Sequence, residues 1–328
     1  MIKIYKTSVE GRTDEVTSLT DKGIWVNIVN PTEEEILMVS REANLLADFL
    51  RAALDEEERS RIEAEDGQIL VLINVPVVAE NEEGIGFIYD TVPLGVIITD
   101  NIIVTVCLRD NEVIQEFTKG GPRAFFTFKR TRFLLQILFI TATLYLKYLR
   151  QIDRQSNQLE QRLHRSMRNE ELVRLLNLEK SLVYFSTSLR ANEIVMEKLL
   201  RSQLAKVPPD TEVTTRVLKM YAEDEDLLED VITENKQAID MADIYTSILS
   251  NTMDAFASVI SNNLNIVMKF LTSVTIVLAL PTMIASFYGM NVRLPLADSP
   301  FAFLVILGMS LVVTGAAVIF LAKRRMFL

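Results

Sequence analysis

Two long apolar runs without a charged residue lie at the C-terminal end of the chain, and they constrain its fold more than any other feature. The first is the nineteen residues from Phe270 to Tyr288, and the second is the twenty-two residues from Phe301 to Ala322. As helices they would be roughly 28 and 33 Å long, close to the ~30 Å of a bilayer hydrocarbon core. The sequence therefore predicts two transmembrane helices joined by a short loop.

Basic residues flank the two runs on the sides away from the connecting loop. Lys269 precedes the first run, and Lys323, Arg324 and Arg325 follow the second, whereas the loop 291–300 holds one arginine and one aspartate. Positive flanks are retained in the cytoplasm. We expect a multi-pass protein of the cytoplasmic (inner) membrane with both termini in the cytoplasm, residues 323–328 forming a basic cytoplasmic tail.

Composition supports a chain that is part membrane and part soluble. Its 328 residues are 49% hydrophobic but 24% charged, with a formal net charge of −10 and a mean hydropathy of +0.22. The acidic balance argues against a nucleic-acid partner, which needs a basic patch, and suits cations as ligands. His164 is the one histidine and no phosphate-binding or dinucleotide motif is present, so we do not expect an enzyme.

Residues 1–122 alternate strand-like and helical segments, which predicts a cytoplasmic α/β domain with a mixed sheet. A helix begins after Pro31, with Thr32 as N-cap and Glu35 as its capping-box partner. A second helix is expected over 46–62. The expected strands are rich in Ile and Val and cover residues 1–5, 23–29, 68–78, 85–99 and 102–106.

Beyond residue 122 the pattern is helical. The apolar run Phe133 to Leu146 is only fourteen residues long and is bracketed by basic side chains, so we expect a buried helix rather than a third span. Long helices are expected over 127–168, 170–206 and 211–290, the last capped by Asp210 or Thr211 after two prolines. The expected parts are a helical hairpin (123–209), a stalk helix (210–269), a first transmembrane helix (270–290), an extracellular loop (291–300) and a second transmembrane helix (301–322).

The last long helix carries two patterns. A heptad-like apolar seam from Leu218 to Val277 predicts a coiled-coil-like stalk that continues into the first span. A separate stripe of polar and small side chains repeats every three or four residues. In a bilayer such a stripe either borders a water-filled path or bonds neighbouring helices together. The stripe consists of Asp254, Ser258, Ser261, Asn265, Met268, Thr272, Thr275, Ala279, Thr282 and Ser286.

Two spans cannot enclose a pore, so a pore implies several copies of the chain. The first span also contains Pro281, which has no N–H and frees the carbonyl of Val277. This proline is expected either to kink the helix or to supply a pore-facing oxygen.

The tripeptide Gly289-Met290-Asn291 follows Tyr288 directly after the first apolar run. In this position, ahead of a second span, it resembles the motif of the CorA family of magnesium transport channels. The Trp25-Val26-Asn27 strand followed by Pro31-Thr32, the very long helix and the basic tail agree with that resemblance, which covers essentially the whole chain. It implies a homopentameric funnel with an α+β cytoplasmic domain, a long helical stalk and two C-terminal transmembrane helices, the first lining the pore.

The resemblance also implies roles for single residues. Gly289, Met290 and Asn291 match a selectivity filter in which asparagine oxygens bind a hydrated divalent cation, a chemistry suited to Mg²⁺ because it dehydrates reluctantly. Asp254 matches an acidic ring at the cytoplasmic mouth. Met268 and Leu271 are the candidates for a hydrophobic constriction, with ordinary helix packing as the alternative. The full pore-lining set is Asp254, Asn265, Met268, Leu271, Thr272, Thr275 and Thr282.

A regulatory Mg²⁺ site between subunits is implied as well. Asp230 matches one of its carboxylates. Near the position where the family has the partner acid, this chain has Ala52, which cannot bind a cation. We therefore assign the partner role to Asp55 and Glu56, which follow shortly after.

The expected function is Mg²⁺ uptake by a homo-oligomer in a lipid bilayer, with Mg²⁺ as both transported and regulatory ion. Two alternatives stay open. One is a zinc or cobalt transporter of the same family, and the other is a membrane-anchored coiled-coil sensor that conducts nothing.

Overall fold

The computed structural model describes residues 1–80, 87–122, 125–166, 169–204, 218, 220–290 and 300–324. The chain divides into two compact units, Met1–Asn251 and Thr252–Leu328. Helix α7 (Ala222–Tyr288) crosses that boundary, and the N-terminal unit holds the seven strands that the described residues form.

The strands form one mixed sheet in the order β2-β1-β3-β7-β6-β5-β4. β3 and β7 pair in parallel and the other neighbours are antiparallel. This confirms the predicted mixed sheet and adds two strands, β2 and β4, that were not predicted. The strands are β1 (Ile2–Thr7), β2 (Thr13–Val16), β3 (Ile24–Val29), β4 (Arg61–Glu65), β5 (Gln68–Glu80), β6 (Phe87–Ile98) and β7 (Ile103–Cys107).

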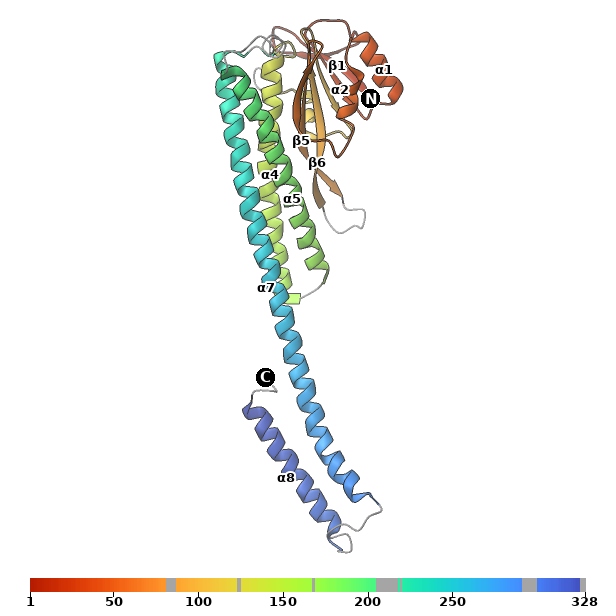
Figure 1. Cartoon of the computed structure of the whole chain (residues 1–328), viewed down its shortest axis with the longest axis vertical. Helices are drawn as coiled ribbons and strands as arrows, with labels where there is room; N and C mark the ends of the chain where they lie inside the picture. Colours follow the sequence, from red (N-terminus) through yellow and green to blue (C-terminus); the bar gives the residue numbers. More distant parts are fainter. Residues whose placement is uncertain are drawn as a thin grey trace. The chain divides into compact units, whose positions relative to one another are not determined.

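Helices cover both faces of this sheet (Figure 1). Alternate residues of β5 face opposite sides of the sheet. Ile69 and Val71 belong to the core shared with α3 (Glu112–Thr118) and α4 (Arg130–Ser166). Leu70 belongs to the core under α1 (Glu33–Glu42) and α2 (Ala47–Ala52). The apolar start of α4 lies inside the first core. Its most apolar stretch is 72% buried, which confirms the predicted buried helix.

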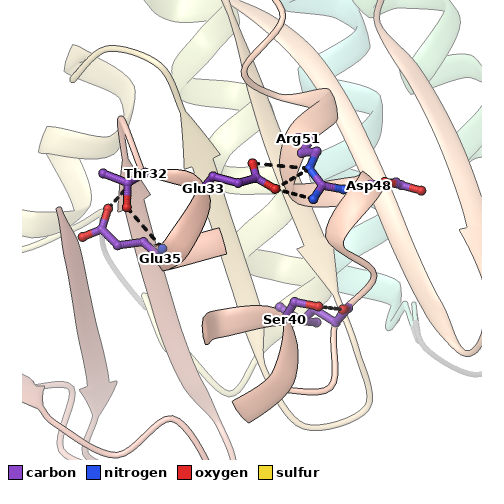
Figure 2. Close-up of polar contacts among 7 residues, drawn as sticks. Thr32, Glu33, Glu35, Ser40, Asp48 and Arg51 are labelled. Atoms are coloured by element: carbon purple, nitrogen blue, oxygen red, sulfur yellow. Dashed lines mark hydrogen bonds and ion pairs between the residues drawn. The ribbon is translucent and has the colours of Figure 1, made fainter. Parts of the chain in front are cut away.

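The start of α1 has the predicted capping box. The Thr32 side chain accepts a hydrogen bond from the Glu35 N–H at 3.2 Å, and the Thr32 N–H donates to the Glu35 carboxylate at 2.9 Å (Figure 2). Arg51 of α2 bonds both Glu33 of α1 and Asp48 of its own helix, which ties the two short helices together.

The predicted helix over 46–62 is wrong beyond Ala52. Residues 61–65 form β4, which pairs with the start of β5 across the two-residue turn Asp66-Gly67. Both turn residues have positive φ, 47° and 78°, as a type I′ hairpin requires. The Asp-Gly pair therefore determines a hairpin where local helix propensity predicted a helix.

The three long helices are α4, α5 (Asn169–Leu204) and α7. The last was expected from residue 211, but Leu218, Met220 and Tyr221 are not helical and α7 begins at Ala222. Tyr221 occupies the N-cap position, and its N–H donates to the Asp224 carboxylate at 3.1 Å, a cap that fixes the start. The predicted caps Asp210 and Thr211 lie outside the described residues.

The seam predicted for a coiled-coil stalk is partly an intramolecular one. In the N-terminal unit, the seam residues Leu228, Asn235 and Ala242 are fully buried. The Asn235 amide donates to the Leu189 carbonyl of α5 at 3.1 Å, and Asp243 of α7 bonds Ser186 and Arg190 of α5. This part of α7 therefore packs on α5.

Candidate functional site

The predicted pore stripe lies on α7 within the C-terminal unit, and every one of its members is exposed. The ten side chains from Asp254 to Ser286 all face outward, and Leu271 beside them is also exposed. The stretch 257–272 is exposed on every side, although it includes apolar residues such as Leu264 and Met268, 62% and 53% exposed. A single chain thus leaves this apolar helix uncovered.

The opposite side of α7 is the covered one. Ser273 is fully buried, and Val277, Pro281, Ile284 and Tyr288 are half-buried at four-, three- and four-residue spacing. At 3.6 residues per turn these positions lie across the helix from Thr275, Thr282 and Ser286. Pro281 and Val277 therefore do not share a face with the predicted pore stripe, which argues against a pore-facing Val277 oxygen as the role of the proline.

Helix α8 (Ala302–Lys323) has one half-buried line of its own. The members are mostly small side chains, which let membrane helices approach closely. They were not among the predicted site residues, although their spacing is visible in the sequence. They are Ala302, Ile306, Ser310, Thr314, Ala317 and Leu321.

Two stripe hydroxyls are satisfied by the helix itself. Thr275 and Thr282 each donate to the carbonyl four residues earlier, Leu271 and Leu278, at 2.9 Å. Each hydroxyl keeps its oxygen lone pairs available as acceptors. Thr275, Ala279, Thr282 and Ser286 line an open hollow of about 540 Å³ along the helix surface. This part of the exposed stripe therefore presents the neutral hydroxyl oxygens of Thr275, Thr282 and Ser286.

The motif residues stand at the end of α7. The Gly289 N–H donates to the Ala285 carbonyl at 3.0 Å and the Met290 N–H to Phe287 at 3.3 Å, so the chain leaves the helix there. Met290 is exposed. Asn291 lies outside the described residues.

The predicted regulatory carboxylates are not gathered within one chain. Asp230 is exposed on α7, and no described side chain forms an ion pair with it. Asp55 and Glu56 lie in the turn after α2, where Glu56 bonds Arg109 at 2.8 Å and Asp55 accepts the Glu57 N–H at 3.0 Å. Over the described ranges, no three His, Cys, Asp or Glu side chains are grouped to hold a metal ion.

Comparison with known proteins matches residues 20–324 to the family model described as CorA-like Mg²⁺ transporter protein. The cobalt/magnesium transport protein CorA of Methanocaldococcus jannaschii is 29% identical over 310 residues, 93% of this chain and 92% of that protein. The magnesium transport protein CorA of Helicobacter pylori is 23% identical over 311 residues, 92% and 90% of the two chains.

Solved structures give the same result for the fold. The complete structure of the CorA magnesium transporter from M. jannaschii superposes with a TM-score of 0.78 at 26% identity, covering 98% of this chain and 96% of that one. The soluble domain of that transporter covers 77% of this chain with a TM-score of 0.63.

Proposed function

The chain belongs to the CorA-like Mg²⁺ transporter family, a family of transport proteins rather than enzymes, and from this premise we propose that it is a Mg²⁺ uptake channel of the cytoplasmic membrane. The observation that carries the proposal is the family match over residues 20–324 together with Gly289-Met290-Asn291 directly after the last turn of α7.

In this proposal several copies of α7 surround the pore, and a pentamer is the expected assembly. The exposed stripe from Asp254 to Thr282 supports it, because a line of oxygens and small side chains opposite the α8-facing side has the placement that pore lining requires. Residues 257–272 also support it, because they are exposed on every side although many are apolar, and neighbouring copies would cover that surface. α7 and α8 are the two spans, α8 lies toward lipid, and both termini are cytoplasmic.

The proposed selectivity uses neutral oxygens. Asn291 amide oxygens from several chains would form a ring that contacts the water shell of Mg²⁺, and the hydroxyls of Thr275 and Thr282 would continue the polar path below. Because Mg²⁺ loses its water reluctantly, a site that accepts the hydrated ion avoids the dehydration cost. Met268 and Leu271 are the proposed hydrophobic constriction, and the exposed Asp254 is the proposed acidic ring.

The proposed regulation places a Mg²⁺ ion between two subunits. Asp230 is accessible for it, and Asp55 is a better partner than Glu56, since Arg109 already neutralises the Glu56 carboxylate at 2.8 Å. An ion shared by carboxylates of two chains would offset their repulsion and hold the closed state.

Cobalt is the second candidate ion, because the M. jannaschii relative is named as a cobalt/magnesium transport protein. The experiment that separates the ions is uptake of Mg²⁺, Co²⁺ and Zn²⁺ into proteoliposomes, with and without a pH gradient. We expect Mg²⁺ uptake that does not need the gradient. Zn²⁺ uptake that does need it would contradict the proposal, and so would the absence of flux of any ion from a folded oligomer.

A further inference from the structure

Thr314, in the middle of α8, has a hydroxyl without a partner. Its Oγ1 is buried and makes no hydrogen bond with any described group. The neighbouring helix behaves differently: the hydroxyls of Ser273, Thr275 and Thr282 each donate to the carbonyl four residues earlier. In the hydrocarbon region, where no water is present, an unpaired polar group costs several kcal/mol. In the structure Thr314 does not use the carbonyl four residues earlier, so an acceptor on the neighbouring helix would satisfy it.

Pro281 creates such an acceptor on α7. Proline has no N–H, so the Val277 carbonyl lacks the donor that position 281 normally supplies. Val277 and Pro281 lie on the half-buried side of α7 with Ile284 and Tyr288. The freed oxygen thus opens on the covered side of the helix and away from the exposed stripe.

The two groups lie at the same depth. α8 follows α7 through one connection and runs back beside its C-terminal part (Figure 1). Val277 is eleven residues before the end of α7 at Tyr288, and Thr314 is twelve residues after the start of α8 at Ala302. At ~1.5 Å per residue both are about 17 Å from the connection. Thr314 also belongs to the half-buried line of α8.

We propose that the Thr314 hydroxyl, unpaired as the structure places it, rotates to donate a hydrogen bond to the Val277 carbonyl that Pro281 leaves without a donor, and that this bond fixes α8 against α7 at the proline. Thr314 is then a positioning residue, because it does not lie on the exposed stripe. Prolines in membrane helices are tolerated where a neighbouring Ser or Thr satisfies the freed carbonyl. The inference concerns the packing of two helices and does not depend on which ion the protein carries.

A double-mutant cycle in the full-length protein tests the coupling. Thr314→Val keeps the side-chain shape and removes the donor, and Pro281→Ala restores an N–H for the Val277 carbonyl. In the Pro281 background we expect Thr314→Val to raise the unfolding equilibrium constant about threefold, the factor of an average hydrogen bond between membrane helices. In the Pro281→Ala background we expect that effect to disappear. Equal effects in the two backgrounds would overturn the proposal.

Ser310→Ala is the matched control, since it removes a hydroxyl from the same half-buried line one turn away. We expect it to show no coupling to Pro281→Ala. A coupling as large as that of Thr314 would assign the effect to general packing and contradict the proposal.

A spectroscopic measurement keeps the proposal testable if a variant folds poorly. Labelling valine carbonyls with ¹³C and leucine amides with ¹⁵N selects only three peptide bonds, at Val71, Val217 and Val277. In solid-state NMR of the membrane-embedded protein we expect Thr314→Val to shift the Val277 carbonyl resonance upfield and Thr314→Ser to leave it in place. An unchanged resonance in Thr314→Val would show that no such bond exists, whether or not the protein conducts ions.

Discussion

The side-chain amide of Asn192 on α5 pairs with the backbone of Asn74 on β5 as a neighbouring strand would. Its Oδ1 accepts the Asn74 N–H at 2.9 Å, and its Nδ2 donates to the Asn74 carbonyl at 2.8 Å. The pairing of β4 with β5 ends at Leu72, so Asn74 lies just beyond the covered part of that sheet edge. The fully buried Asn192 therefore satisfies an edge that β4 does not reach and attaches α5 to the sheet.

Replacing Asn192 by Ala should destabilise the cytoplasmic part. The change leaves the Asn74 N–H without its partner at a half-buried position and removes one of the donors to the Asn74 carbonyl. We expect a loss of about 2–4 kcal/mol of unfolding free energy. Denaturant unfolding followed by the fluorescence of Trp25, the one tryptophan, measures it. Asn157→Ala, at an exposed position on α4, is the control and should change stability by less than about 0.5 kcal/mol. Equal losses in the two variants would contradict the role of Asn192.

Cys107 should be unreactive in the folded protein. Burial raises the pKa of its thiol to about 12 from 9.0, with a further contribution from Asp110. A rise of three units lowers the thiolate fraction near pH 8 by about a thousandfold. We expect maleimide labelling to be slower than in denaturant by at least that factor. Because the thiol pKa is higher in the folded than in the unfolded protein, the buried thiol contributes fully to stability below pH 9. This contribution is lost as the pH rises toward 12. Rapid labelling of the native protein at pH 8 would rule out the buried thiol.

Residues 1–251 should remain soluble without detergent. They form one of the two compact units, and the apolar run of α4 from Phe133 to Leu146 packs inside it against the sheet. Size-exclusion chromatography in detergent-free buffer should give a folded, monodisperse species, whereas a chain ending at 290 keeps the apolar run of α7 and should need detergent. If residues 1–251 partition into membranes, α4 is a third span and the two-span proposal is wrong.

Asp230→Asn should weaken closure by Mg²⁺. Removing the charge removes a hard anionic ligand from the proposed regulatory site, so a higher Mg²⁺ concentration should be needed to inhibit flux. Flux measured against internal Mg²⁺ checks this. Glu229→Gln, an exposed neighbour on the same helix with the same charge change, is the control. An identical shift in both variants would indicate a general charge effect and would contradict a site at Asp230.

The features that were predictable from the sequence are those that local chemistry determines. One physical interpretation fits each of three features: the uncharged runs, the Thr32–Glu35 capping box, and the short apolar run at the start of α4 with its basic flanks. The structure agrees for the capping box and for α4. The stripe on α7 was predictable as a pattern, because helical periodicity places its members on one side.

Other features depended on contacts between distant segments. The hairpin at Asp66-Gly67 had a recognisable turn signal, but the helix propensity of the residues before it predicted the opposite. The start of α7 at Ala222 depends on the Tyr221–Asp224 cap and on Arg132, whose guanidinium lies 3.5 Å from Asp224. The unpaired Thr314 hydroxyl could not be predicted, since burial at one helix face is set by the neighbouring helix.

We propose that Asn291 forms the ion-selective entrance of a Mg²⁺ channel, and the decisive measurement is Mg²⁺ flux into proteoliposomes. The purified oligomer and its Asn291→Ala variant should be compared at equal protein density, with matched elution profiles showing that both assemblies are intact. We predict Mg²⁺ uptake by the parent protein and its loss in Asn291→Ala. Unchanged Mg²⁺ uptake by an intact Asn291→Ala oligomer would show that Asn291 does not form this entrance.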